Sequence, residues 1–396
     1  LFGEALVALH INGRSEPTAF DEYLVRLNQH GDYDMCFLGW NFGTFDADVL
    51  GDEWWGENAD APFMNFANWR NDSYDALRDD LMYSTDYDVI RAASDAMQEI
   101  WIYECPWIVA YNNVEIGAYR TDRFEGHQND ISGGVVGFWT NYKVHLKDSL
   151  GGPFGGTYRW NNPKDVATFN FMAASSAYTW NVLGMMHDGM FTIGPDGVDI
   201  PWIAESYISE THADDATIPD GHTRFTFDII QNATWTDGRP LTAYDVAFSL
   251  NYMRDAPGSR TAPELKDVSA AYAPTTSTLI VEFDTESYWH LHRISYKPVI
   301  PKHIFEVIGV DNWNTWQPTP PADEMVTCGP FNVSMYVEGE FVEMTRNPNY
   351  YYGLERPDTT PTPTDGAPDL IMPIVAGAVG AAVVILVGGY VLMRQK

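Results

Sequence analysis

Apolar residues at helical spacing predict helices over residues 20–30, 74–82 and 89–104. In the last of these, one face of the helix carries Ile90, Ala93, Met97, Ile100 and Trp101. A stripe of this kind marks the side of a helix that faces a core.

Short apolar runs in the same region predict strands. Residues 33–38 form one such run, and residues 107–111 form another directly after Pro106, a residue that ends helices. Helices that alternate with strands are typical of an α/β unit, and we expect this unit to end near residue 145.

The second half of the chain shows the two-residue period of strands. Alternation of apolar and polar residues predicts strands at 225–230 and 278–284, and a pair within 331–347. Glu338 and Gly339 lie in the middle of that pair, so we expect a hairpin with its turn there.

The segment 232–255 contains both a turn and a helix start. Asp237-Gly238 predicts the turn, and Thr242 with Asp245 three residues later resembles a capping box. The buried stripe of the helix is expected to be Ala243, Val246, Ala247, Leu250 and Met253.

Residues 370–393 predict a transmembrane helix, because these 24 consecutive residues carry no charge and are long enough, as a helix, to span about 30 Å of hydrocarbon. Arg394 and Lys396 follow, so residues 394–396 are expected in the cytoplasm and everything upstream outside the cell. Residues 353–369 are rich in Thr and Pro and predict an extended stalk. Because the anchor is at the carboxy terminus, we expect it to be of the archaeal type.

An exported chain needs a signal, and none precedes Leu1, so we expect the protein to begin upstream of this sequence. Three sequons agree with export and make Asn71, Asn232 and Asn332 candidate glycosylation sites.

The charge excludes nucleic acid as a partner. The chain has 23 Lys and Arg against 55 Asp and Glu, a formal net charge of −32, which repels phosphates. Solubility is the favoured explanation, and a calcium or cationic-ligand role is the alternative. The carboxylates at residues 46–60 lack the EF-hand spacing, so we expect a solvated acidic loop there.

No enzyme or cofactor motif is present. GxSxG, HExxH and the phosphate-binding loop are absent, and the glycines of 151–156 lack dinucleotide-loop spacing. The cysteines, Cys36, Cys105 and Cys328, lack zinc spacing, although one bridge between Cys36 and Cys105 stays open. His290 and His292 are expected on one side of a strand, as surface histidines.

Several motifs in the second half carry a family resemblance: PWIAESYISE, DGHTRFTFDIIQNATWTDGRPLTAYDVAFSL, KPVIPKHIF, CGPF and TRNPNYYYG. In this order they resemble the amino-terminal lobe of family 5 extracellular solute-binding proteins, the peptide, nickel and oligosaccharide receptors of ABC importers. The earlier GDYDMCFLGWNFGTFDAD, NDSYDALRDD and DVIRAASDAMQEIWIYECPWIVAYN are similar to the carboxy-terminal lobe of that family.

The resemblance implies a two-lobed α/β fold of the periplasmic-binding-protein type (type II), with its lobes in a non-standard order, plus one C-terminal transmembrane helix. Residues 1–145 are expected to be part of a carboxy-terminal lobe and 146–156 a linker. Residues 157–352 are expected to be part of an amino-terminal lobe. A fragment of a tandem receptor explains this order more simply than a permuted one.

By resemblance, the ligand lies between the lobes and no enzyme activity is implied. The expected ligand-binding residues are Gly39, Trp40, Asn41, Asp46, Ser175, Ser176, Ala177 and Tyr178. The alternatives are core packing for Trp40 and helix capping for Ser175 and Ser176.

Peptide-binding members carry an Asp where this chain has Gly43, so Asp46 or Asp48 would have to replace it in pairing with an amino group. We expect an oligopeptide-like solute and an ABC importer permease as partners. An oligosaccharide ligand or a structural, adhesive role is the alternative.

Overall fold

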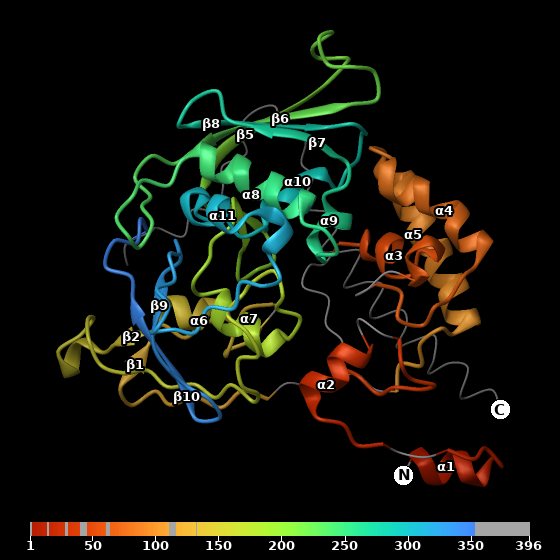
Figure 1. Ribbon diagram of the computed structural model, residues 1–396, viewed down its shortest axis with the longest axis horizontal. Helices are drawn as coiled ribbons and strands as arrows, with labels where there is room; N and C mark the ends of the chain where they lie inside the picture. Colours follow the sequence, from red (N-terminus) through yellow and green to blue (C-terminus); the bar gives the residue numbers. More distant parts are fainter. Residues whose placement is uncertain are drawn as a thin grey trace.

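The computed structural model describes residues 2–13, 16–27, 31–39, 46–60, 64–110, 116–131 and 133–352. Two clusters of buried apolar side chains organise these residues. The larger lies mainly within residues 157–352, which we call the sheet lobe. The smaller lies mainly on helices within residues 46–60 and 64–104, which we call the helical module. Figure 1 shows the two beside each other.

The sheet lobe is built on an antiparallel sheet with the strand order β5-β6-β8-β7. Its strands are β5 (Ala204–Thr211), β6 (Thr223–Ile229), β7 (Val268–Tyr272) and β8 (Thr278–Phe283). In β6, Phe225, Phe227 and Ile229 are buried, whereas Arg224, which comes just before them, points to the other face and pairs with Glu282 of β8. The predicted two-residue period is therefore confirmed, because one face of the sheet meets a core and the other meets water.

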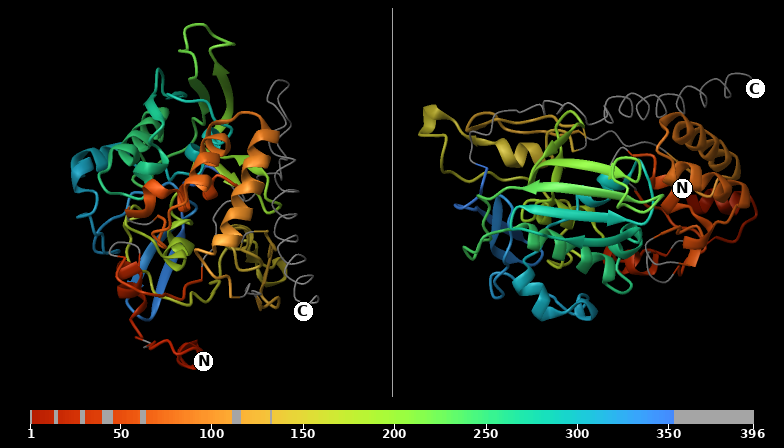
Figure 2. Two further views of the ribbon diagram at one scale, coloured as in Figure 1. Left: turned by 90° about the vertical axis from the view of Figure 1, so that its right-hand side faces the viewer. Right: turned by 90° about the horizontal axis from the view of Figure 1, so that it is seen from above.

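Helices cover the buried face of this sheet (Figure 2, right). They are α8 (Ala243–Asp255), α9 (Thr261–Glu264), α10 (His290–Ser295) and α11 (Lys302–Ile308). α8 packs on β7 and β8 through its buried stripe. The predicted capping box is present, since Thr242 and Asp245 exchange side-chain and backbone hydrogen bonds. The preceding turn buries Trp235 and places Gly238 at φ 85°, a conformation that favours glycine.

Two hairpins and a short helix complete the lobe. They are β3 (Phe191–Ile193) with β4 (Asp199–Pro201), β9 (Phe331–Val337) with β10 (Phe341–Arg346), and α7 (Ala177–Leu183). The β9–β10 hairpin confirms the prediction for residues 331–347, and its turn contains Gly339 at φ 76°. A 3₁₀ turn, η4 (Val310–Asn312), follows α11.

The helical module consists of α3 (Val49–Glu53), η2 (Gly56–Asp60), α4 (Asp72–Tyr83) and α5 (Tyr87–Glu104). The two long helices confirm the predictions for residues 74–82 and 89–104. Each starts two residues earlier than its apolar pattern, because the side chains of Asn71 and Asp86 accept hydrogen bonds from the first backbone N–H groups. Of the helix predicted over 20–30, α2 (Phe20–Val25) is present. α1 (Phe2–Ala8) was not predicted.

Both strands predicted in the first part of the chain are wrong where the structure describes them. Residues 33–38 and 107–110 are in neither strand nor helix, and Ile108 and Val109 are 74% and 72% exposed. An apolar run becomes a strand only when a neighbouring strand pairs with its backbone, and periodicity alone does not supply one.

The segment after the helical module packs on the sheet lobe. It contains β1 (Phe124–Glu125), α6 (Phe138–Lys143), β2 (His145–Leu146) and the 3₁₀ turn η3 (Asp148–Leu150). The Trp139 indole donates to the Ile193 carbonyl of β3 at 2.9 Å, and the ring meets Trp202. Figures 1 and 2 show this segment on the side of the sheet lobe opposite α4 and α5.

A segment of the sheet lobe in turn enters the core of the helical module. Trp289 is 2% exposed and packs in one cluster with Tyr74, Leu81 and Met97. Its indole donates to the Leu81 carbonyl at 2.8 Å, and the Ser287 hydroxyl donates to the Met82 carbonyl. The helical module therefore shares its core with a residue more than 180 positions away in the sequence.

Among the described residues no helix is both long and apolar enough to cross a membrane. The predicted stalk at 353–369, the predicted span at 370–393 and the tail at 394–396 lie outside that part of the chain.

Replacing Trp289 tests the shared core. We expect Trp289→Ala to lower the free energy of unfolding by about 3–5 kcal/mol, because a large ring leaves a cavity. Hydrogen exchange should accelerate in α4 and α5 more than in β6 and β8. Trp289→Phe is the control: it keeps a ring but removes the donor to Leu81, so a smaller loss of about 1–3 kcal/mol is expected. Equal acceleration in both regions would contradict a core specific to the helical module.

Candidate functional site

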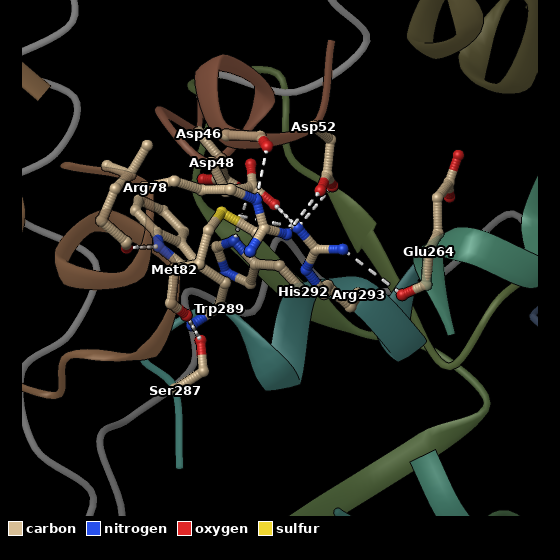
Figure 3. A network of polar contacts seen from close by, with 12 residues as sticks. Asp46, Asp48, Asp52, Arg78, Met82, Glu264, Ser287, Trp289, His292 and Arg293 are labelled. Carbon is tan, nitrogen blue, oxygen red and sulfur yellow. Dashed lines mark hydrogen bonds and ion pairs between the residues drawn. The ribbon is translucent and has the colours of Figure 1, made fainter. Parts of the chain in front are cut away.

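A network of charged and polar side chains joins the helical module to the sheet lobe (Figure 3). One side is the acidic segment before and within α3, with Asp46, Asp48 and Asp52. The other side is the short helix α10 of the sheet lobe, with His292 and Arg293. We call these groups, with their direct partners, the inter-module network.

His292 is bonded through both of its ring nitrogens. Nδ1 lies 2.7 Å from Asp46 Oδ2, and Nε2 lies 2.8 Å from Asp199 Oδ2 of β4. The Tyr296 hydroxyl donates to the other oxygen of Asp199. Burial alone lowers the pKa of His292, but its bonds to Asp199 and Asp46 outweigh this and raise it from 6.5 to about 10. His292 is therefore a cation held between two carboxylates from different parts of the fold.

Arg293 makes the second connection. Its Nη2 lies 2.6 Å from Asp52 Oδ2 and 3.1 Å from Asp48 Oδ2, and its Nη1 donates to the Glu264 carbonyl at 3.4 Å. The side chain is 7% exposed. Burial lowers the pKa of Arg293, but Asp52 and Asp48 raise it by more, so the group stays charged. A buried guanidinium needs such partners, since leaving it unpaired costs several kcal/mol.

Arg78 of α4 extends the network behind Asp52. Its Nη2 lies 3.5 Å from Asp52 Oδ1, and its Nε donates to the Gly51 carbonyl at 2.9 Å. The guanidinium also lies 3.8 Å from the centre of the Trp55 ring, and Lys266 of the sheet lobe lies 5.0 Å from the same ring. Cations from both modules thus meet at one aromatic side chain.

Two acidic groups of this interface hold protons more tightly than usual. Burial raises the pKa of Asp48 from 3.8 to about 6, although Arg293 opposes the shift. Burial likewise raises the pKa of Glu53 from 4.5 to about 7, and its buried Oε2 accepts no hydrogen bond. Carboxyl groups with such pKa values change charge near neutral pH.

Two interpretations of the sequence are corrected here. The acidic segment is not a solvated loop, because Asp46, Asp48 and Asp52 are paired with buried cations. The histidines are on helix α10 rather than on a strand, and neither is a surface group. His290 is 1% exposed, stacks on Phe283 and has its pKa lowered to about 3 by burial.

Sequence reasoning missed Asp199 and Arg293. Asp199 is part of the short strand β4. Arg293 is the one arginine in the segment 288–296, whose other basic residues are histidines. A cation inside an apolar helix is a signal of a buried ion pair, but nothing in the sequence identifies its partners.

The predicted ligand residues from the first part of the chain separate into three groups. Gly39 is exposed, and Asp46 is bonded to His292. Trp40 and Asn41 lie outside the described residues, as does Gly43, the position where peptide-binding members carry an Asp.

The predicted ligand residues of the sheet lobe lie around the start of α7. Ser175 is partly exposed, and Ser176 is buried at the N-cap position but makes no side-chain capping bond. Ala177 is exposed, and the Tyr178 ring meets Phe20 of α2 with centroids 6.2 Å apart. A residue of the chain before the helical module therefore contacts the predicted ligand segment of the sheet lobe.

Other candidate groups are placed as follows. Within the described ranges no three His, Cys, Asp or Glu residues form a group that could hold a metal ion. Cys36 and Cys105 are free thiols, so the bridge left open by the sequence is not formed. Among the sequons, Asn232 is exposed, Asn71 caps α4, and Asn332 accepts a bond from Thr327.

Comparison with known proteins identifies the sheet lobe. Residues 200–363 match the family model of bacterial extracellular solute-binding proteins, family 5 Middle. Over these residues the chain is therefore similar to extracellular solute-binding proteins of family 5. The resemblance read from the motifs of the second half is confirmed, and the resemblance of the earlier segments to a carboxy-terminal lobe stays a prediction.

Relatives with curated descriptions agree. A putative ABC transporter peptide-binding protein from Brucella ovis is 27% identical over 198 residues, 48% of this chain and 34% of that protein. A probable ABC transporter-binding protein from Deinococcus radiodurans is 29% identical over 215 residues, 50% of this chain and 33% of that protein. The chain thus spans about a third of the length of the curated relatives it matches.

Among solved structures, the oligopeptide-binding protein AppA from Bacillus subtilis, in complex with a nonapeptide, is similar with a TM-score of 0.41 and 16% identity. The match covers 48% of this chain and 36% of AppA.

Replacing Arg293 tests the network. Arg293→Ala should lower the free energy of unfolding by about 3–5 kcal/mol at pH 8, because Asp48 and Asp52 lose their buried cation. Arg293→Lys keeps the charge but has a single nitrogen, which cannot bond both the two carboxylates and the Glu264 carbonyl, so a smaller loss is expected. Urea unfolding of the full chain measures both. A loss below about 1 kcal/mol for Arg293→Ala would mean that the pair behaves like an exposed one.

Proposed function

We propose that this chain is part of an extracytoplasmic solute receptor that delivers its ligand to an ABC importer. The match of residues 200–363 to family 5 carries the proposal. The relatives described as ABC transporter-binding proteins support it, since they match about half of this chain. The receptor binds and releases its solute without converting it.

The solute class that we propose is an oligopeptide. Several aligned relatives are described as peptide-binding, including the periplasmic oligopeptide-binding protein OppA of Salmonella typhimurium, which is 24% identical over 213 residues. In this proposal the solute contacts the start of α7, at Ser175 to Tyr178, and the loop from Gly39 to Asp46. Exposed backbone in such segments can pair with an extended peptide.

Asp46 is the proposed partner of the peptide's amino group. In the structure its carboxylate is bonded to the His292 ring at 2.7 Å. A ligand ammonium group would therefore have to share or replace that cation. A charge-assisted hydrogen bond of this kind is worth about 1.5–3 kcal/mol.

Calorimetry with the full chain tests the solute class. We expect free-amine oligopeptides to bind, and amino-terminal acetylation to weaken binding about ten- to a hundredfold. In Asp46→Asn the acetylated and free peptides should bind alike, because the charged partner is gone. Asp237→Asn is the control, since Asp237 pairs with His303 elsewhere on the sheet lobe.

The alternatives give different results in the same experiment. Binding of neutral oligosaccharides, lost in Trp40→Ala but not in Asp46→Asn, would favour a sugar receptor that uses ring stacking. Absence of binding to either class would favour a structural or adhesive surface protein built from receptor lobes.

The proposal includes a membrane tether. The uncharged residues 370–393 and the Thr- and Pro-rich residues 353–369 support an anchor and a stalk, with the lobes outside the cell and the permease as the neighbouring partner.

Protease treatment of intact cells tests this topology. Cleavage in the stalk should release a soluble fragment that contains both the helical module and the sheet lobe, while a tag placed after Lys396 stays protected. Release should disappear when the prolines and threonines of 357–364 are replaced by a compact helical spacer. Recovery of the intact chain from the cytosol would contradict the receptor proposal.

A further inference from the structure

Helix α10 carries two charged side chains, His292 and Arg293, and both reach the acidic segment of the helical module (Figure 3). His292 bonds Asp46 before α3, and Arg293 bonds Asp48 and Asp52. Beside them, Trp289 enters the core of α4 and α5, and the Tyr288 N–H donates to the Ser84 carbonyl at 3.2 Å. Residues 287–293 thus attach the helical module to the sheet lobe through ion pairs, hydrogen bonds and apolar packing.

We propose that His292 and Arg293 form a latch that holds the acidic segment Asp46–Asp52 on the sheet lobe, and that the latch loosens when His292 loses its proton. Arg293 keeps its charge and provides a permanent attachment. His292 provides the variable one, because both of its ring nitrogens are bonded to carboxylates. When the ring is neutral, one nitrogen has no proton and faces a carboxylate oxygen across a hydrogen-bond distance.

The groups that face His292 come from every element packed around it. They are Asp46 and Asp48 from the acidic segment, Asp199 of β4, and Tyr296 and Arg293 of α10 itself. Two further tyrosines are close enough to feel these charges. Burial raises the pKa of Tyr207 and of Tyr288, and the charge of Asp199 adds to the first shift and that of Asp46 to the second. The carboxylates outnumber Arg293, so this surrounding favours the cationic ring.

The sign of the pH effect follows from the two states of the latch. In the closed latch the pKa of His292 is raised from 6.5 to about 10. The contribution of His292 to the attachment is therefore complete below pH 6.5 and is lost as pH rises toward 10. Each pKa unit between the two states changes the closing equilibrium about tenfold.

Asp48 and Glu53 act in the same direction at lower pH. Their pKa values in the closed latch are raised to about 6 and about 7, so burial favours the protonated carboxyls. Their contribution is greatest below the ordinary values of 3.8 and 4.5 and declines up to pH 7. The carboxyl groups therefore act mainly below pH 7 and His292 mainly above it, so an experiment over the whole pH range can tell their contributions apart.

Hydrogen exchange of the full chain between pH 5 and pH 10.5, corrected for intrinsic rates, tests the latch. In the wild type, protection of residues 46–60 and 72–104 should fall at least about tenfold between pH 7 and pH 10. β6 and β8 should keep their protection and serve as the internal folding control. In His292→Gln, the change above pH 7 should be absent, and only the change below pH 7 should remain.

His303→Gln is the matched control. His303 Nε2 lies 2.8 Å from Asp237 Oδ2, so it is also a histidine–aspartate pair, but both partners belong to the sheet lobe. This variant should show the wild-type profile in residues 46–60 and 72–104.

A second variant separates a proton-dependent latch from simple packing. Asp199→Asn removes one carboxylate from His292 on the sheet-lobe side, so the midpoint of the loss of protection should move to lower pH by at least one unit. The NMR titration of the His292 ring should move with it.

A wild-type midpoint in His292→Gln, or in Asp199→Asn, would overturn the proposal. If His292→Gln does not fold, the Asp199→Asn midpoint decides alone. None of these measurements requires a bound solute, so they stand apart from the test of the proposed function.

Discussion

Two neighbouring cations on a six-residue helix, α10, can be buried only if carboxylates from elsewhere in the fold reach them. Asp46, Asp48 and Asp52 supply this charge from one side, and Asp199 supplies it from the other. The position of the acidic segment is therefore determined by electrostatics as much as by apolar packing. The helical module, which has few buried apolar residues of its own, depends on this attachment and on Trp289.

The two cores are connected in both directions along the chain. Trp139, which precedes the sheet lobe, packs into the larger core, and Trp289 of the sheet lobe packs into the smaller one. A division of the chain into consecutive, independent units does not describe this packing. The segment after residue 115 lies with the sheet lobe, on the side away from α4 and α5 (Figure 1). The extent of the predicted domains, with a boundary near residue 145, stays a prediction.

For a solute receptor, the inter-module network has a further consequence. Ligand binding in a two-part protein depends on how readily the parts separate and close. Here Asp46 is both a proposed ligand group and a partner of His292, so the attachment of the helical module and the availability of that carboxylate are linked. Protonation of Asp48 and Glu53 near neutral pH, and loss of the His292 proton at higher pH, change the charge of the same interface.

The sequence by itself determined the elements whose signals are local. The alternation in β6 and β8, the capping box of α8, the β9–β10 turn and the helices α4 and α5 each depend on neighbouring residues. The motifs of the sheet lobe carried its resemblance to family 5. Tertiary structure decided the rest. The apolar runs at 33–38 and 107–110 found no partner strand, His290 became a core residue, and the acidic segment became half of a buried network. Pairing of strands and of buried charges depends on groups up to 246 residues apart, and no local pattern specifies which groups meet.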